Sequence, residues 1–144
     1  MALNKLTRIS LPKEEYILLL GTSISVFSSN YSFLIENILR NDTEQSFNWH
    51  DLVDENRMKK IYKAINDTIT PIKGTSIVDI FKEIIVMRNR IIHSFRITSK
   101  SGEQILATKN PDNQKQFEIS EQYLKDFIHL NNKLSELLHE LRGY

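Results

Sequence analysis

The chain has 144 residues, 40% of them hydrophobic, with only four glycines, three prolines and no cysteine. This length and composition predict one globular, helical domain spanning residues 1–144, and they exclude a disulfide framework and a thiolate metal site. The formal net charge of +1 excludes a broad attraction to nucleic acid, so any contact with RNA requires a local basic patch.

The first predicted helix runs from about Ser10 to Arg40. Ser10 precedes Leu11 and Pro12, a pattern typical of a helix start. The apolar run at 16–20 is too short to cross a bilayer, so we expect no membrane contact and a cytoplasmic protein. Apolar residues recur every three or four positions and predict one buried face, formed by Leu20, Ile24, Phe27, Tyr31, Leu34, Ile35 and Ile38.

The next segment is polar but contains Phe47 and Trp49, which predicts a loop that two aromatic side chains hold against the core. We interpret Trp49 as such a packing residue rather than as a platform for a nucleic-acid base. Asp51 or Asp54 can cap a second helix, which the sequence TPIKGTS at 70–76 ends through its proline and glycine.

The third predicted helix begins at Ser76, where Asp79 completes a pattern like a capping box, and it contains VMRNRIIHSF at 86–95. Arg88 lies in the middle of its apolar stripe. Burying an unpaired guanidinium costs several kcal/mol, so Arg88 requires a partner, a second subunit or a phosphate. The stripe consists of Ile77, Phe81, Ile84, Arg88, Ile91 and Phe95.

A second, mostly polar stripe with Asn89 and His93 lies on the opposite side of this helix. Arg88 and His93 are therefore about 140° apart on a straight helix. They can act on one atom only if the helix ends near His93 or a second copy contributes. Because one bundle cannot satisfy both stripes, we expect a homodimer through the third helix. No acidic residue occurs at 84–102, where Arg90, Arg96 and Lys100 lie. Together with Lys82 of the polar stripe, these residues are the ones predicted to bind RNA.

After the third helix, Phe95–Thr98 and Gln104–Thr108 predict a small β-hairpin, followed by a loop. Ser120 is placed to cap a last helix. Four helices with a hairpin before the last one predict an all-α fold, and an up-and-down bundle is the most economical packing. The inner face of the last helix consists of Tyr123, Phe127, Leu130, Leu134, Leu137, Leu138 and Leu141.

The sequence RNRIIH at 88–93 resembles the R-x4-6-H signature of the HEPN superfamily, in which a polar residue, often Asn, follows the Arg. The resemblance implies a four- or five-helix up-and-down bundle and a metal-independent endoribonuclease, often the toxin of a toxin–antitoxin or phage-defence system. It implies that Arg88 and His93 are the catalytic pair and Asn89 a polar helper. It also implies a homodimer whose two motifs line one cleft, an antitoxin protein as a possible partner, and no metal or other cofactor.

These residue types suit RNA cleavage without a metal. The ribose 2′-hydroxyl can act as the nucleophile, a histidine can move protons near neutral pH, and an arginine can hold the phosphate. No His, Asp and Glu cluster has metal-ligand spacing. One departure concerns Phe95. In HEPN toxins paired with a minimal nucleotidyltransferase, the motif continues to a tyrosine that is adenylylated, and Phe95 has no hydroxyl to modify.

Two other interpretations stay open. A non-catalytic HEPN-like module would bind RNA, nucleotide or a protein partner. A helical bundle without a nucleic-acid role would pair Arg88 with a core acid of its own subunit. His129 and His139 lie off the apolar face of the last helix, and we expect both to be solvated surface residues.

Overall fold

The computed structural model describes residues 3–143, apart from the side chain of Asn4. Within this range the chain forms six α-helices and one three-stranded antiparallel sheet, so the predicted mainly helical class is confirmed. The single-domain prediction covers residues 1–144, of which residues 1, 2 and 144 lie outside the described range. A single domain over the whole chain therefore stays a prediction.

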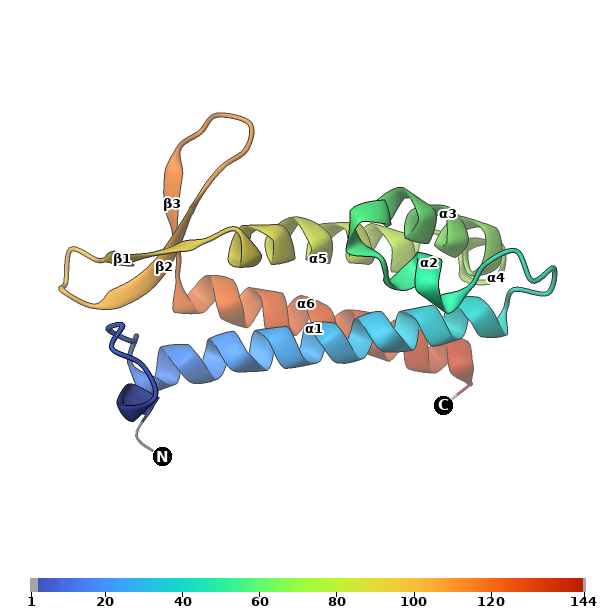
Figure 1. The fold of residues 1–144 in the computed structure, drawn as a ribbon. Coiled ribbons are helices and arrows are strands. Elements are labelled where there is room, and N and C mark those ends of the chain that lie inside the picture. Colours follow the sequence, from blue (N-terminus) through green and yellow to red (C-terminus); the bar gives the residue numbers. More distant parts are fainter. Residues whose placement is uncertain (1–2, 144) are drawn as a thin grey trace.

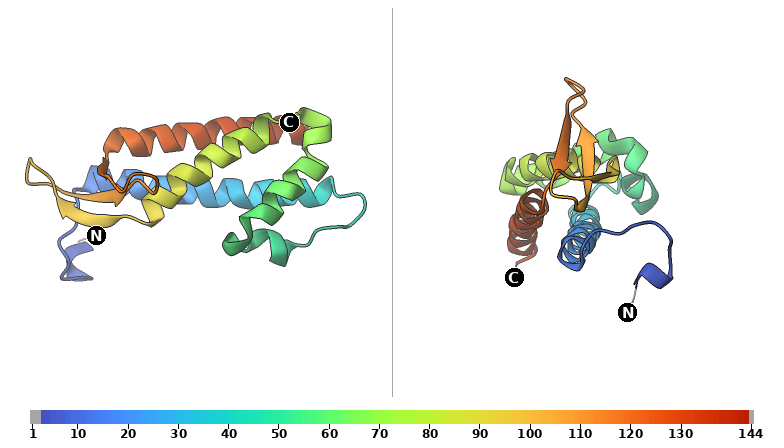
Figure 2. Two further views of the ribbon diagram at one scale, coloured as in Figure 1. Left: turned by 90° about the horizontal axis from the view of Figure 1, so that it is seen from above. Right: turned by 90° about the vertical axis from the view of Figure 1, so that its left-hand side faces the viewer.

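Three long helices lie side by side, with the short helices at one end of the molecule and the sheet at the other (Figure 1). Seen from above, α5 crosses obliquely over α1 and α6 (Figure 2). The helices are α1 (Glu14–Arg40), α2 (Trp49–Val53), α3 (Met58–Thr68), α4 (Thr70–Lys73), α5 (Ser76–Ile92) and α6 (Glu121–Arg142), with 3-10 turns η1 (Leu3–Lys5) and η2 (Glu55–Arg57). The strands are β1 (Phe95–Thr98), β2 (Gln104–Lys109) and β3 (Gln116–Ile119).

Helices α1 and α6 run in the same direction, and three contacts along their length show it. Near the start of both helices, Tyr16 Oη donates to the Ile119 carbonyl at 2.6 Å. In the middle, Asn30 Nδ2 donates to the Asn131 carbonyl at 2.7 Å. At the far end, Arg142 of α6 forms a 2.9 Å ion pair with a glutamate of α1. The first and last helices are therefore parallel neighbours.

Helix α5 runs antiparallel to α1. Its Phe81 ring lies 6.0 Å from the ring of Tyr31, whereas Arg88, two turns later, lies over Phe27, four residues earlier in α1. The predicted apolar stripe of α5 is buried from Ile77 to Ile91. Its last predicted member, Phe95, is 41% exposed because α5 ends at Ile92 and the chain continues as β1.

The sheet has the strand order β1-β2-β3 with antiparallel pairing throughout. The sequence predicted the first two strands but not β3, whose QFEI sequence offers only two apolar residues and follows a polar loop. Ile119 of β3 pairs with Leu106 and is fully buried, so tertiary packing creates this strand. The Tyr16 hydroxyl accepts from the Leu106 N–H at 3.1 Å and joins the sheet to α1.

Several predicted helix ends differ from the structure. Helix α1 begins at Glu14 rather than Ser10, Pro71 belongs to α4 rather than ending a helix, and Ser76 is the first residue of α5, with no side-chain cap. The cap by Ser120 is confirmed, because its hydroxyl accepts from the Tyr123 N–H at 3.0 Å. A cap is worth only about 1 kcal/mol, so packing of the helix faces can override it.

Helix α1 is more apolar than the sequence analysis assumed. By length and composition it could span a membrane, with a mean hydropathy of 1.3 over 18 residues. Core helices of soluble proteins pass the same test, and the expectation of a cytoplasmic protein without membrane contact stays a prediction. Ile24 was predicted to be buried, but it is 42% exposed because it lies at the wall of an open pocket.

Replacing Tyr16 with Phe should lower the free energy of unfolding by about 1–3 kcal/mol, because the Ile119 carbonyl and the Leu106 N–H would both lose a buried partner. Urea denaturation measures this change. Tyr123→Phe is the matched control, since the Tyr123 hydroxyl makes only a 3.5 Å contact with the Met87 carbonyl. Equal losses in the two variants would contradict the role assigned to Tyr16.

Candidate functional site

Arg88 is buried in the core stripe of α5 and is only 9% exposed. Its Nη2 forms an ion pair with Glu55, and its Nη1 donates to Asn89 Oδ1 at 3.1 Å. Its guanidinium carbon lies 5.5 Å from the centre of the Phe27 ring, within the range of a cation–π contact. Arg88 Nε is buried and has no partner among the described residues. The guanidinium is therefore held on three sides but not fully satisfied.

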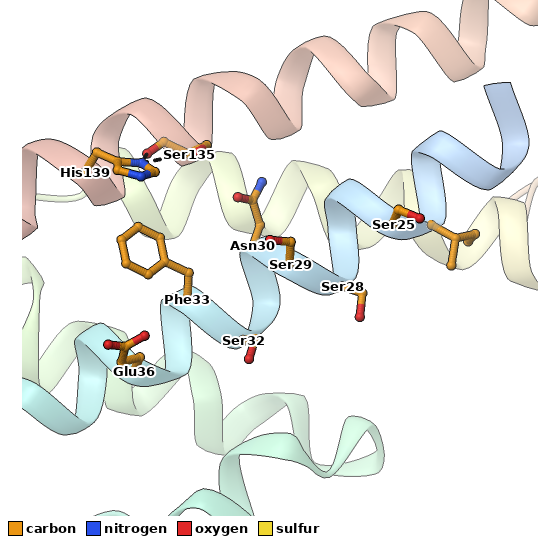
Figure 3. Close-up of a pocket in the computed structure, with 10 residues that line it drawn as sticks. Ser25, Ser28, Ser29, Asn30, Ser32, Phe33, Glu36, Ser135 and His139 are labelled. Carbon is orange, nitrogen blue, oxygen red and sulfur yellow. Dashed lines mark hydrogen bonds between the residues drawn. The ribbon is translucent and has the colours of Figure 1, made fainter. Parts of the chain in front are cut away.

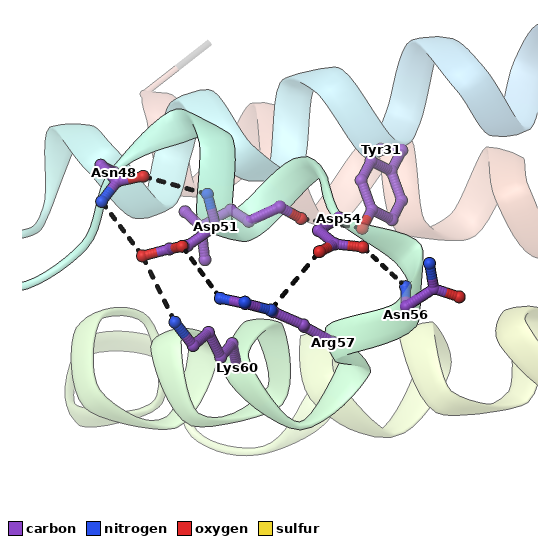
Figure 4. A network of polar contacts seen from close by, with 8 residues as sticks. Tyr31, Asn48, Asp51, Asp54, Asn56, Arg57 and Lys60 are labelled. Atoms are coloured by element: carbon purple, nitrogen blue, oxygen red, sulfur yellow. Dashed lines mark hydrogen bonds and ion pairs between the residues drawn. The ribbon is translucent and has the colours of Figure 1, made fainter.

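Glu55 reaches Arg88 from the turn between α2 and α3, and a polar network fixes this turn (Figure 4). The Asn48 side chain caps α2 by accepting from the Asp51 N–H at 3.0 Å. Arg57 then bridges Asp51 and Asp54, both at 3.4 Å. Exposed ion pairs of this kind contribute little individually, but together they restrict the backbone that carries Glu55.

Tyr31 connects this turn to α1, because its buried hydroxyl donates to the Leu52 carbonyl at 2.9 Å. Burial is the main cause that raises the pKa of Tyr31 to about 12, and the nearby Glu55 carboxylate adds to the increase, whereas Arg88 opposes it. The hydroxyl is therefore neutral at physiological pH and stays a hydrogen-bond donor. It holds α2 against α1 beside Arg88.

Asn89 and His93 lie on the other side of the helix end. Asn89 is half-buried, with its side-chain oxygen on Arg88, so the structure brings these two motif residues together. His93 is exposed and follows the last residue of α5, where its carbonyl accepts from the Thr108 hydroxyl at 3.1 Å. No contact between Arg88 and His93 occurs in the described part of the chain. His93 is the C-cap of α5, and its N–H still donates to the Asn89 carbonyl at 2.9 Å.

The four residues predicted to bind RNA do not form one patch. Lys82 lies 5.5 Å from the centre of the Tyr62 ring of α3, which is at the short-helix end. Lys100 is exposed in the β1–β2 turn, at the opposite end. Arg90 donates to the Lys109 carbonyl at 2.7 Å, and Arg96 donates to the Ser10 carbonyl. These cations have separate partners or positions, so a shared role in RNA binding stays a prediction.

An open pocket of about 330 Å³ lies beside Arg88 and Glu55. Its wall combines aromatic and aliphatic side chains with two serine hydroxyls from α1. The remaining lining residues are Ile24, Phe27, Ser28, Tyr31, Ser32, Ile35, Trp49, Val53 and Ile92. Ile92 directly precedes His93, so the pocket extends from Arg88 to the end of the helix that carries the histidine.

A larger hollow of about 890 Å³ lies between α1 and α6 (Figure 3). It contains none of the predicted site residues. His139 lies at its edge, with its ring 4.8 Å from the Phe33 ring and its Nδ1 donating to the Ser135 carbonyl at 2.7 Å. His139 is exposed, as expected for a surface residue, but it has partners within the protein. We therefore place the candidate site at Arg88 and not in the larger hollow.

Sequence reasoning missed Glu55 and Trp49. Glu55 is 33 positions away from Arg88, and no spacing rule connects the two. Trp49 was assigned to a loop, but it opens the short helix α2 and is 43% exposed. The buried arginine was the available signal for Glu55, since it required an acidic partner from some other part of the chain.

The expectation of a homodimer assumed that one bundle cannot satisfy both stripes of this helix. Glu55 and Asn89 of the same chain contact Arg88, so Arg88 has partners within one copy, and the homodimer stays a prediction. The interpretation without a nucleic-acid role predicted that Arg88 pairs with a core acid of its own subunit. Glu55 is an acid of the same subunit, although its side chain is 50% exposed rather than in the core. Among the described residues, no three His, Cys, Asp or Glu side chains gather in a way that could hold a metal ion.

Comparison of the chain with protein-family models, with curated proteins and with solved structures finds no match. The likeness to the HEPN superfamily therefore depends on the residues of the motif.

Replacing Glu55 with Ala should lower the free energy of unfolding by about 1–2 kcal/mol, because it leaves the buried Arg88 charge with weaker partners. The loss is smaller than for a fully buried pair, since Glu55 is half-exposed. Urea denaturation of Asp67→Ala provides the control, because Asp67 belongs to an exposed pair with Lys63. If the two variants lose the same stability, the Glu55 contact does not stabilise Arg88.

Proposed function

We propose that the protein is a metal-independent endoribonuclease of the toxin or phage-defence type. The observation that carries the proposal is Arg88. Arg88 lines an open pocket, its buried Nε has no partner among the described residues, and the exposed His93 follows at the end of the same helix. A positively charged donor of this kind suits a phosphate oxygen, and histidine suits proton transfer near neutral pH.

In the proposed reaction, the ribose 2′-oxygen forms a bond to phosphorus while the bond from phosphorus to the 5′-oxygen breaks. His93 takes the proton of the 2′-hydroxyl and returns a proton to the leaving 5′-oxygen. Arg88 offsets the charge that develops on the phosphate. Asn89, which already contacts Arg88, orients the guanidinium. The products are a 2′,3′-cyclic phosphate and a 5′-hydroxyl.

Glu55 has a defined part in this proposal. Its carboxylate occupies Nη2 of Arg88, and Nε is shielded from solvent. A phosphate that uses the Nε and Nη2 edge must therefore displace the Glu55 side chain, which is half-exposed and free to turn toward solvent. Phosphate binding thus exchanges one anionic partner of Arg88 for another.

We further propose the four- or five-helix up-and-down bundle that the resemblance implies, and a homodimer through α5. The parallel direction of α1 and α6 supports an odd number of helices, because alternating directions return the last helix to the direction of the first. The exposed His93 supports a dimer, since a second copy can place another motif in the same cleft.

A non-catalytic module that binds RNA, nucleotide or protein is the second candidate. The observation in its favour is that Arg88 contacts Glu55 and Asn89 but not His93 in the described part of the chain. Such a module would use the pocket without cutting the nucleic acid.

Purified protein should cleave RNA in the presence of EDTA and leave 2′,3′-cyclic phosphate ends, because no step of the proposed reaction uses a metal. Mass spectrometry of the products detects these ends. Activity that appears only after Mg²⁺ or Mn²⁺ is added would contradict the mechanism.

His93→Ala should reduce cleavage by about 10²-fold or more and leave RNA affinity nearly unchanged, because His93 acts on protons. Arg88→Ala should weaken both, because its charge contacts the phosphate before and during the reaction. Arg96→Ala and His139→Ala are the controls, and all four variants should keep their helical circular dichroism. Cleavage by His93→Ala at the wild-type rate would instead support the binding module.

Sedimentation equilibrium should give a dimer at about ten micromolar, where protein interfaces of ordinary affinity are occupied. Val86 is 64% exposed on α5, and Val86→Glu should shift the protein toward monomer if α5 forms the interface. A monomer at tens of micromolar would reject the dimer without deciding whether one copy cuts RNA.

A further inference from the structure

We propose that the 330 Å³ pocket beside Arg88 binds a guanine base of the RNA, stacked on Trp49 and recognised by Glu55. The inference rests on the proposed function, because it names the base next to the phosphate that Arg88 holds. It is carried by three groups of the pocket: an exposed tryptophan, two serine hydroxyls without partners in the described structure, and a carboxylate with one free oxygen.

Trp49 is the first of these groups. The sequence suggested that Phe47 and Trp49 both hold the loop, but only Phe47 packs against the core. Trp49 is 43% exposed and lines the pocket together with Tyr31 and Phe27. The cap by Asn48 and the Tyr31 hydrogen bond fix the helix that carries Trp49. An exposed, backbone-anchored aromatic beside a cation is a suitable surface for base stacking.

The hydroxyls of Ser28 and Ser32 are the second group. Both serines are exposed on α1 and line the pocket. Elsewhere in this helix, Ser23 donates to the Leu19 carbonyl at 2.8 Å, the usual bond of a helical serine. In the described structure Ser28 and Ser32 make no such bond. Figure 3 shows both side chains pointing away from His139 and Ser135. They are available to a ribose or a base edge.

Glu55 is the third group and determines the choice of base. One of its carboxylate oxygens contacts Arg88, and the other has no partner among the described residues. When a phosphate takes the place of Glu55 on Arg88, the released carboxylate can accept from new donors. Guanine offers two adjacent N–H groups, N1–H and N2–H, to a carboxylate, which accepts but cannot donate. Adenine and cytosine offer only their amino group, and uracil only one N–H.

The exchange also keeps the guanidinium paired with an anion. Arg88 loses the carboxylate and gains the phosphate, while Glu55 loses the guanidinium and gains two N–H donors. The buried guanidinium is therefore never left without an anion. A pocket of 330 Å³ lies at the lower end of ordinary ligand sites, about 300–1,000 Å³, so it suits one nucleotide.

The chain has a single tryptophan, so its fluorescence reports directly on this pocket. We would titrate the wild-type protein with the four nucleoside 3′-monophosphates, and with inorganic phosphate and ribose 5-phosphate as probes without a base. Guanosine 3′-monophosphate should quench Trp49 and bind about tenfold more tightly than the other three nucleotides. The two probes without a base should leave the fluorescence unchanged.

Three variants, studied by calorimetry, assign the contacts. Trp49→Leu should weaken guanosine 3′-monophosphate about tenfold or more, whereas Trp49→Phe should keep most of the affinity because it preserves an aromatic face. Glu55→Gln should reduce the preference for guanine to about twofold or less, since an amide can also donate to other bases. Ile72→Leu, at an exposed aliphatic residue of α4 that does not line the pocket, is the control and should bind as the wild type does.

Several outcomes would overturn the inference: equal affinity for all four nucleotides, quenching by inorganic phosphate alone, or no binding at millimolar concentration. A guanine preference that survives in Glu55→Gln would also overturn it. Different outcomes would reject the proposed function. RNA cleavage without a guanine preference would keep the ribonuclease and reject the pocket, whereas guanine binding without any RNA cleavage would keep the pocket and reject the ribonuclease.

Discussion

The burial of the Arg88 guanidinium is the constraint on which the organisation of this protein depends. A charge that is nine-tenths buried must have partners, and α5 alone supplies only Asn89. The remaining partners come from α1, through the Phe27 ring, and from the turn before α3, through Glu55. Three separate segments of the chain therefore converge on one side chain. The polar network around Arg57 and the hydroxyl of Tyr31 keep the turn that carries Glu55 in position.

The pocket beside Arg88 follows from the same arrangement. Helix α2 is only one turn long, so it packs on α1 at Tyr31 but leaves the Ile24 side of α1 uncovered. Its first residue, Trp49, then forms a wall instead of packing into the core. A longer or more apolar α2 would cover α1 and bury the guanidinium completely. The short length of α2 therefore keeps Arg88 within reach of a ligand.

The sequence predicted those features that repeat locally. The apolar periods of α1, α5 and α6 are strong enough to identify helices, and the position of Arg88 within its stripe was visible from residue spacing alone. Features that depend on distant contacts could not be predicted. Strand β3 exists because Ile119 pairs with Leu106, and Glu55 meets Arg88 only after the chain has turned back on itself. The helix ends were the least predictable, since weak cap preferences compete with packing.

The parallel pairing of α1 and α6 has a consequence for how the chain folds during synthesis. Helix α1 leaves the ribosome first, but the buried contacts of Asn30 and Tyr16 require residues 119 and 131. Roughly 80 residues separate the end of α1 from the start of α6. The side of α1 that packs against α6 therefore stays uncovered while these residues are synthesised. Chaperones or premature association would act on the chain in this interval. The core closes only when the last helix emerges and docks beside the first.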